Sequence, residues 1–257
     1  MKGHPNRLLP WLGFLLLGSC AAPGGTKAHP WRKSPRVPGA SSLEAGRAPH
    51  PAGAASRPKV YRERIEWIRA WIPDAHHDLL PRVLLVGDSI TQGYYGRVAG
   101  LLSGKAYVGS LTTSLSVCDP KFPDVLKPVL ESFRFSVIHF NNGIHGPKYS
   151  LEAYRRGLDK TFRFLREKAK GAKIVWASTT PVRFRPANKD RNTQIRARNR
   201  AALELARKYN LPVDDLYALS KDLDPLHRDD YHYKPKAIQA QARAVARFLE
   251  RFIPKRK

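Results

Sequence analysis

The segment RVLLVGDSIT, residues 82–91, decides the fold of this chain. Its apolar run at residues 83–86, closed by Gly87, is typical of a strand buried on both faces of a parallel sheet. Gly87 permits a tight turn, after which a helix is expected to begin close to Ser89. Because backbone N–H groups at a helix N-terminus favour negative charge, a nucleophilic Ser89 would be well placed there. Asp and Ser are also ordinary N-caps, so this triplet alone is weak evidence.

Working outward from this segment, apolar runs alternate with helical periodicity. Strands are predicted at residues 82–86, 106–108, 135–140, 173–177 and 211–213, and helices at residues 60–72, 94–103, 123–131, 151–169, 195–209 and 238–252. This alternation predicts one α/β domain with a mostly parallel, five-stranded sheet. Ligands of such sheets bind at the carboxyl ends of the strands, so residues with a chemical role are expected directly after strands.

A second motif, LHRDDYH at residues 226–232, lies just before the predicted C-terminal helix. A serine nucleophile needs a general base, and that base needs a carboxylate that orients it. Asp229 and His232 have the spacing D-x-x-H, which lets the two side chains converge within one turn. Asp230 is an alternative carboxylate, although the spacing favours Asp229. The simpler interpretation is a polar loop whose aspartate caps a helix.

Taken together, residues 80–252 resemble the SGNH (GDSL) hydrolase family. The resemblance rests on four blocks in the family's order, which are GDSIT at 87–91, IHFNNGIH at 138–145, WASTTPV at 176–182, and the pair Asp229 and His232. It implies a three-layer, flavodoxin-like sandwich and an ester hydrolase, often a carbohydrate deacetylase. It also implies that Ser89 is the nucleophile, His232 the general base and Asp229 its orienting carboxylate.

Two blocks depart from the family pattern. The third block is usually G-x-N-D, and here His145 stands where that asparagine helps to bind the oxyanion, with Asn142 close by. Either of the two could be the donor. The second block usually supplies a glycine N–H, but no glycine follows in the expected loop, which leaves Gly109 or a backbone N–H near Thr113 or Ser114. Since losing one oxyanion donor costs about 10²–10³ in rate, weak or altered activity is one possible consequence.

Further side chains are candidates for substrate binding. Arg183, Arg185 and Arg191 follow the fourth predicted strand, on the side where ligands bind, and could contact an anionic substrate. The alternative is that they belong to a solvated loop. Trp67 and Trp71, on the first predicted helix, are expected in the core, with a sugar-stacking platform as the alternative.

The remaining histidines and the second cysteine have structural interpretations. We expect His139 to be a hydrogen-bonded interior residue, His227 to support its loop, and Cys118 to be a small buried hydrophobe. Histidines do not cluster with ligand spacing and only one cysteine remains for a site, so we expect no metal and no cofactor.

The chain is strongly basic, with a formal net charge of +25 over 257 residues. Residues 1–58 hold only eight of the 46 basic side chains, so the excess is spread along the chain. Such a field attracts anionic surfaces, including membranes, acidic polysaccharides and nucleic acid. The alternative is a genome that favours arginine. The predicted export argues against nucleic acid as a specific partner.

The N-terminus, residues 1–20, is typical of an export signal. Lys2 and Arg7 precede an apolar stretch at residues 8–18, which is too short to span a bilayer. It ends in LGSC, which resembles the bacterial lipobox and predicts that Cys20 is lipidated. The protein would then be exported and anchored in the bacterial cell envelope. The alternative is ordinary secretion with cleavage elsewhere.

Residues 21–58 are rich in Pro, Gly, Ala and Ser and have almost no apolar periodicity. They are predicted to be a disordered tether, followed by the hydrolase-like domain at residues 59–257. We therefore expect a monomeric serine esterase that deacetylates a carbohydrate or cell-envelope ester through an acyl-enzyme. A glycan O-acyltransferase using the same residues and a non-catalytic envelope-binding protein with a degenerate site are the alternatives.

Overall fold

The computed structural model describes residues 59–254. The predicted signal peptide at residues 1–20, its lipidation site Cys20 and the predicted tether at residues 21–58 lie outside the described residues. Among the described helices, none combines the length and the apolar character that crossing a bilayer requires.

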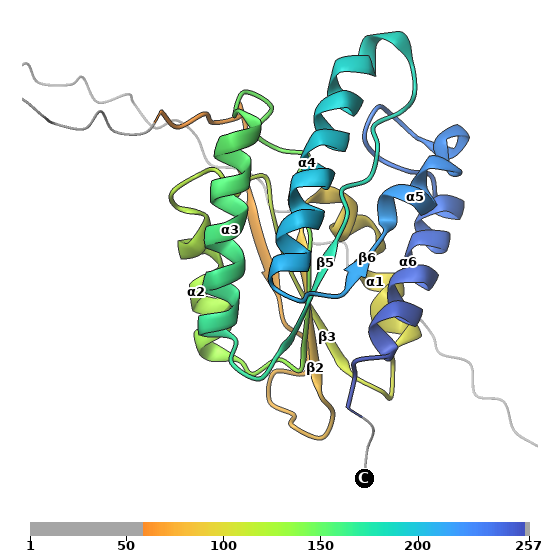
Figure 1. Ribbon diagram of the computed structural model, residues 1–257. Helices are drawn as coiled ribbons and strands as arrows, with labels where there is room; N and C mark the ends of the chain where they lie inside the picture. Colours follow the sequence, from red (N-terminus) through yellow and green to blue (C-terminus); the bar gives the residue numbers. More distant parts are fainter. Residues whose placement is uncertain (1–58, 255–257) are drawn as a thin grey trace, which may run out of the picture. The chain divides into compact units, whose positions relative to one another are not determined.

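The described residues form a six-stranded sheet between two layers of helices (Figure 1). In spatial order the strands are β1 (Ile68–Trp71), β3 (Tyr107–Thr113), β2 (Arg82–Gly87), β4 (Val137–Phe140), β5 (Lys173–Ala177) and β6 (Val213–Asp214). All neighbours pair in parallel except β1, which runs antiparallel to β3. Without β1, the order is that of a flavodoxin-like sheet, and its switch point falls between β2 and β4.

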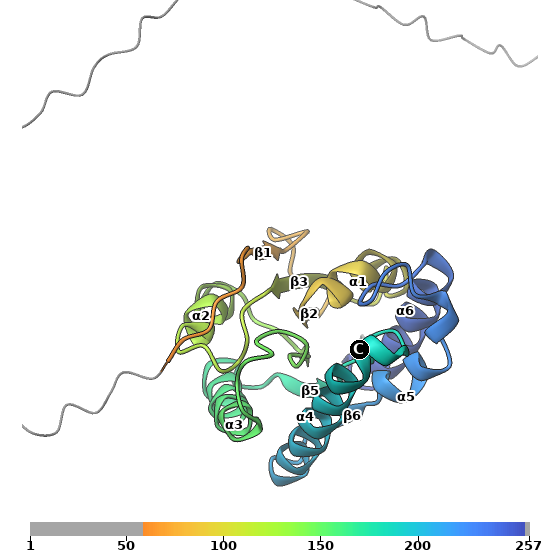
Figure 2. The same ribbon diagram turned by 90° about the horizontal axis from the view of Figure 1, so that it is seen from above.

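Helices cover both faces of this sheet. They are α1 (Ser89–Leu101), α2 (Phe122–Ser132), α3 (Leu151–Lys168), α4 (Lys189–Lys208), α5 (Leu216–Lys221) and α6 (Pro235–Glu250), with short 3₁₀ turns η1 (Pro186–Asn188) and η2 (Asp224–Leu226). Seen from above, α2 and α3 lie on one side of the strands and α1, α5 and α6 on the other (Figure 2). The predicted three-layer α/β fold is therefore confirmed.

Strand β2 shows why the apolar run identified this fold. Leu84 and Val86 pack with α2, α3 and α4 in one core, whereas Val83 and Leu85 pack with α1 and α6 in the other. Successive side chains of a strand point to opposite faces, so both faces of a central strand must be apolar. The carboxyl end of β2 therefore lies between the two helical layers, where Ser89 follows it.

The prediction of a helix at residues 60–72 is wrong. This segment has no helix, and its last residues form the edge strand β1, which pairs with β3. The apolar residues that suggested a helical stripe do not share a buried face, because Ile65, Ile68 and Trp71 are 64%, 57% and 56% exposed. β-branched and aromatic side chains suit a strand, and the open edge of β3 supplies the pairing.

Two sheet predictions are also corrected. The sheet has six strands rather than five, because β1 was taken for a helix. The second predicted strand, residues 106–108, is part of the longer β3, which continues through polar residues to Thr113. These residues are buried because β1 and β2 pair with both edges of β3 and the two cores cover its faces. Their small side chains gave no apolar pattern to extend the prediction.

Candidate active site

Ser89 begins helix α1 directly after strand β2. The Asp88 carboxylate caps this helix, with Oδ1 accepting a hydrogen bond from the backbone N–H of Ile90 at 2.9 Å. Gly87 is required at the turn, since a Cβ there would lie 2.1 Å from the Thr91 hydroxyl. The first backbone N–H groups of a helix have no partner within it, so they are free to face a developing anion beside Ser89.

The structure brings Ser89, His232 and Asp229 together. Ser89 Oγ lies 2.9 Å from His232 Nε2, although 143 residues separate them in sequence. On the other side of the ring, His232 Nδ1 lies 2.9 Å from Asp229 Oδ2 and 3.0 Å from Oδ1. A hydroxyl, an imidazole and a carboxylate in this order can pass the hydroxyl proton to the ring while the carboxylate holds the ring's orientation.

The carboxylate of this triad is fixed by its own loop. Asp229 Oδ1 accepts hydrogen bonds from the backbone N–H groups of Tyr231 at 2.9 Å and His232 at 2.8 Å. Partial burial would raise the pKa of Asp229, but these N–H groups and the His232 ring outweigh it and hold that pKa well below its usual range. The alternative carboxylate, Asp230, instead accepts from Arg185. Of the two, Asp229 is therefore the one that contacts the ring.

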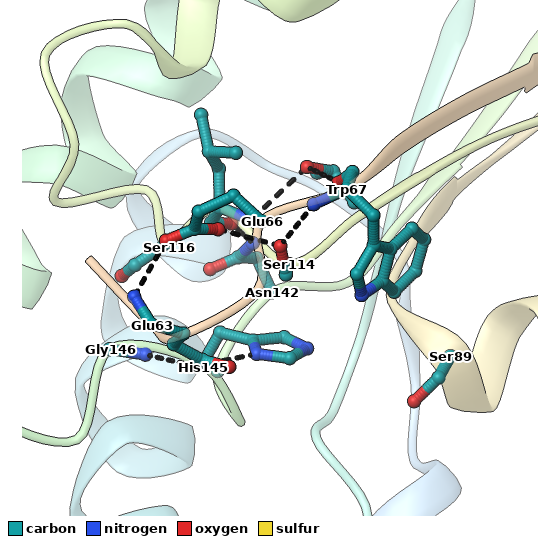
Figure 3. Close-up of polar contacts among 12 residues, drawn as sticks. Glu63, Glu66, Trp67, Ser89, Ser114, Ser116, Asn142, His145 and Gly146 are labelled. Atoms are coloured by element: carbon teal, nitrogen blue, oxygen red, sulfur yellow. Dashed lines mark hydrogen bonds and ion pairs between the residues drawn. The ribbon is translucent and has the colours of Figure 1, made fainter. Parts of the chain in front are cut away.

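His145 is the predicted oxyanion donor that the structure places beside Ser89. Both line one pocket, and Figure 3 shows the His145 ring directed to the side on which Ser89 lies. His145 Nδ1 lies 2.8 Å from Glu63 Oε1, while Nε2 is buried without a hydrogen-bond partner. Burial lowers the pKa of His145, but the bond to Glu63 and the nearby Asp88 carboxylate outweigh it and raise that pKa above its usual value. The imidazolium form carries a hydrogen on Nε2 that can be donated.

Asn142 and Thr113, the other predicted oxyanion donors, are corrected here. The Asn142 amide is buried, accepts from Val117 N at 3.0 Å and donates to Leu115 O at 2.8 Å. Thr113, predicted to supply a backbone N–H, lies in β3 opposite Ile68 of β1, and its buried hydroxyl donates to Trp67 O. Neither residue lines the pocket that holds Ser89. Both side chains hold the loop after β3 in place instead.

The departure in the second block also has a structural explanation. The backbone N–H of Ser114 donates to Trp67 O at 3.1 Å, and that of Leu115 donates to Thr113 Oγ1 at 3.1 Å. The carbonyl of Trp67, the residue before β1, therefore occupies the N–H of Ser114, one of the groups predicted to face an oxyanion. Figure 3 shows this contact region beside the pocket, with Glu66 bonded to Ser114.

The segment before β1 forms one wall of the pocket, and sequence analysis missed it. We call residues 59–67 the strap. The pocket has a volume of about 520 Å³ and is lined by Tyr61, Arg62, Glu63, Arg64, Ser89, Ile144, His145, Gly146, Pro147, Lys148, Arg191, Tyr231 and His232. Glu63 of the strap is 82 residues from its partner His145. A contact of this range leaves no local signal in the sequence.

Of the three arginines predicted to contact a substrate, only Arg191 lines the pocket. Arg183 is exposed and Arg185 pairs with Asp230, and neither lines the pocket. They leave the strand end on an outer loop that continues into η1 and α4. Both therefore lie outside this pocket. Arg191, which belonged to the same prediction, does line it.

A buried arginine of α4 holds the loop that carries His145. Arg198 is fully buried and donates to the carbonyl oxygens of Gly143 at 3.0 Å, His145 at 2.9 Å and Gly146 at 2.7 Å. Its guanidinium also lies 5.0 Å from the centre of the Tyr154 ring. These contacts use the Nη1 and Nη2 donors within the fold, and Arg198 does not line the pocket that holds Ser89, so its role is one of positioning.

Several other singled-out residues lie away from the pocket. His139 is buried and bonds to Asp214 at 3.0 Å, and His227 is buried and bonds to Asp224 O at 3.0 Å, so both are interior residues as expected. Burial raises the pKa of Cys118, which keeps its thiol protonated. Among residues 59–254, no three His, Cys, Asp or Glu side chains gather as they would around a metal ion.

The two tryptophans are not core residues of a helix. Trp71 lies in β1 and is 56% exposed, which contradicts the expected core position. Trp67 is half-buried at the end of the strap, where its backbone N–H donates to Ser114 Oγ at 2.9 Å. Figure 3 shows its ring on the side of the strap that faces Ser89.

Comparison with known proteins places the fold. A scan of protein-family models finds no match, and a search of curated sequences finds none either. Solved structures do match. They include a candidate SGNH hydrolase from Slackia heliotrinireducens at 20% identity and TM-score 0.53, covering 65% of this chain and 98% of that one. The described domain therefore has the fold of the SGNH hydrolases.

Two further structures with this fold carry named activities. An acetyl xylan esterase matches at 15% identity and TM-score 0.53, over 65% of this chain and 99% of its own. A lipase/acylhydrolase from Enterococcus faecalis matches at 16% identity and TM-score 0.51, over 69% of this chain and 99% of its own. At these identities the likeness concerns the fold, and the activity of this chain has to be argued from its own residues.

Proposed function

We propose that this chain is a serine ester hydrolase of the SGNH type that acts through an acyl-enzyme. The observation that carries the proposal is the unbroken contact from Ser89 Oγ to His232 Nε2, at 2.9 Å, and from His232 Nδ1 to Asp229 Oδ2, also at 2.9 Å. These distances are within hydrogen-bond reach, as a nucleophile and its general base require.

In the proposed reaction, His232 Nε2 takes the proton of Ser89 as its oxygen attacks the ester carbonyl. The tetrahedral oxyanion accepts hydrogen bonds from the Ser89 backbone N–H and from Nε2–H of His145. His232 then gives the proton to the leaving alcohol, and an acyl group remains on Ser89. Water, deprotonated by the same ring, attacks this acyl group and releases the acid, which restores the Ser89 hydroxyl.

A carbohydrate ester is the proposed substrate class, and acetyl is the proposed acyl group. The open pocket of about 520 Å³ offers Tyr61 and Tyr231 as aromatic surface beside the triad. One structural neighbour is named an acetyl xylan esterase, which supports the same class. A sugar hydroxyl in place of water would make the same residues an acyltransferase, so product analysis with a donor ester and an acceptor glycan distinguishes the two.

We also propose that the protein is a lipoprotein of the bacterial cell envelope. The support is the apolar stretch at residues 8–18 followed by LGSC, which ends at Cys20. Anchoring there would place the hydrolase domain at the end of a chain long enough to reach envelope polymers.

The replacement Ser89→Ala tests the proposed activity. We expect it to lower the hydrolysis of p-nitrophenyl acetate by at least about 10³-fold, because the nucleophile is lost while the remaining site is intact. The melting temperature should not change, since the hydroxyl's one hydrogen bond to residues 59–254, that to His232, is only partly buried.

Labelling with a fluorophosphonate provides a second measurement. The wild-type chain and the control Ser132→Ala, which changes an exposed serine at the end of α2, should both be labelled, and Ser89→Ala should not. Equal turnover in Ser89→Ala would contradict the proposal. Absence of labelling in the wild type would instead favour the non-catalytic alternative, for which the occupied N–H of Ser114 is an argument.

A further inference from the structure

The pocket beside the triad is lined by more cations than anions. Arg62, Arg64, Lys148 and Arg191 all line it. Arg62 pairs with Asp119 at 3.0 Å, outside this set. The pocket's carboxylate, Glu63, is already bonded to His145. The charge that faces a bound ligand is therefore positive.

Arg191 is the cation that most clearly lacks a partner. It is half-buried, its Nε is buried without a hydrogen-bond partner, and no carboxylate among residues 59–254 lies within salt-bridge distance of it. Burial lowers the pKa of Arg191, which reflects the free energy cost of holding this cation away from water. An arginine remains charged despite such a cost, so a site of this kind favours a ligand that supplies the missing anion.

The Arg191 side chain is also held in place. Its Nη1 donates to Gln194 Oε1, and Gln194 Nε2 donates in turn to Pro147 O at 2.8 Å. Pro147 belongs to the same loop as His145, so the guanidinium and the oxyanion donor are positioned by one segment. Arg198, two turns further along α4, also has a buried Nε without a partner, but its Nη1 and Nη2 donate to loop carbonyls and it does not line the pocket. The role of Arg198 is to hold the loop, whereas Arg191 uses only Nη1 for a contact within the fold and keeps other donors for a ligand.

We infer that the substrate of this pocket is an ester that bears an anionic group, a carboxylate or a phosphate, close to the scissile bond, and that Arg191 binds this group. Arg64 and Lys148 at the pocket rim add long-range attraction. The inference rests on the proposed function, because that function makes the pocket a substrate site. It refines the substrate from a carbohydrate ester in general to an acidic one.

Binding to the Ser89→Ala variant tests the inference without turnover. The probes are trigalacturonate, which carries carboxylates, glucose 6-phosphate, which carries a phosphate, and the neutral xylotriose, each measured by calorimetry. We expect at least one anionic probe to bind about tenfold or more tightly than xylotriose, which is typical of a charge-assisted hydrogen bond. The arm that binds identifies the anion.

The added replacement Arg191→Gln should remove that preference, whereas the control Arg200→Gln, an exposed arginine of the same helix outside the pocket, should retain it. Equal binding of xylotriose, or an unchanged preference in Arg191→Gln, would overturn the inference. In parallel, the wild type is assayed on acetylated polygalacturonate and acetylated xylan. Anion binding without hydrolysis of any ester would reject the proposed function and leave Arg191 as an anion-binding residue, whereas hydrolysis without anion preference would reject this inference alone.

Discussion

At the scale of single residues, the unusual feature of this site is a histidine where the resembled family has an asparagine. An asparagine amide donates a hydrogen bond at any pH, but His145 Nε2 donates only when the ring is cationic, because Nδ1 is directed to Glu63. The strap thus supplies a positioning residue for the oxyanion site. As pH rises, the His145 ring loses its Nε2 hydrogen and can no longer donate to the oxyanion. The rate of the proposed reaction should therefore fall at high pH, which an asparagine donor would not cause.

Glu63→Gln should move the high-pH limit of activity. His145 is cationic below its raised pKa and loses its Nε2 hydrogen as pH rises through that value, so kcat/KM for p-nitrophenyl acetate should fall there. Glu63 and Asp88 raise this pKa, whereas burial and Arg191 lower it. Removing the Glu63 charge leaves burial to dominate, so the fall should begin at lower pH than in the wild type.

The pH–rate profile, with His145→Ala as its lower limit, checks this. We expect His145→Ala to lose about 10²–10³ in kcat at a pH where the wild type is active and its His145 is cationic, as for other oxyanion donors. Glu66→Gln is the matched control, because that carboxylate accepts from Ser114 and from the backbone N–H of Glu63 but does not contact His145, and a glutamine oxygen can still accept. A profile in Glu63→Gln that overlays the wild type would show that the Glu63 charge does not control the donor.

Sequence analysis identified the triad because its members stand in local motifs. Ser89 follows an apolar strand, and Asp229 and His232 share one turn. It left His145 and Asn142 undecided, since both are polar residues in one loop, and only their hydrogen bonds separate them. Glu63 was not a candidate, because nothing near it in the sequence indicates that it meets His145.

At the scale of elements, the fold was predictable where apolar runs are buried on both faces. Strand β2 has such a pattern and helix α3 has one continuous apolar stripe, and both were expected within a few residues of their actual bounds. Strand β1 was not, because an exposed edge strand needs no continuous apolar face and its pairing partner, β3, lies more than 35 residues away. Pairing of β1 with β3 therefore outweighs the helical spacing of apolar residues in this segment.

Arg198 links two elements, and its loss should be costly. Replacing it with methionine keeps much of the side-chain volume but leaves the buried carbonyls of Gly143, His145 and Gly146 without their donor. We expect Arg198→Met to lower the free energy of unfolding by about 3 kcal/mol, measured by urea denaturation. Arg200→Met, an exposed position of the same helix, should change it by less than about 0.5 kcal/mol. A similar small change in both variants would mean that water replaces the guanidinium.

At the scale of the whole molecule, the topology explains why distant motifs meet. Ser89 follows β2 and the His145 loop follows β4, which are the two strands that flank the switch point of the sheet. Chains diverge to opposite faces at such a point and leave a crevice at the carboxyl ends of the strands. The LHRDDYH segment precedes α6 and completes the crevice from the other layer.

The proposed lipid anchor would hold the active-site crevice at the cell envelope, and this anchor depends on the sulfur atom of Cys20. If Cys20 is the lipidation site, Cys20→Ser removes the thiol to which lipid is attached, and the protein should move from the membrane fraction to the soluble fraction of a bacterial host. Each buried CH₂ of an acyl chain contributes about 0.8 kcal/mol to membrane binding. A serine at position 20 has no thiol to carry an acyl chain, so this binding free energy is lost. Labelling with radioactive palmitate should be lost in the same variant.

The control is Cys118→Ser, which removes the half-buried thiol of the described domain and should leave both labelling and membrane association unchanged. If Cys20→Ser remained in the membrane fraction while losing its label, the basic surface of the chain would have to hold it there. High salt would then release it, because electrostatic binding to anionic lipid is screened and a lipid anchor is not. Retained palmitate label in Cys20→Ser would place the lipid on another residue and reject the LGSC prediction.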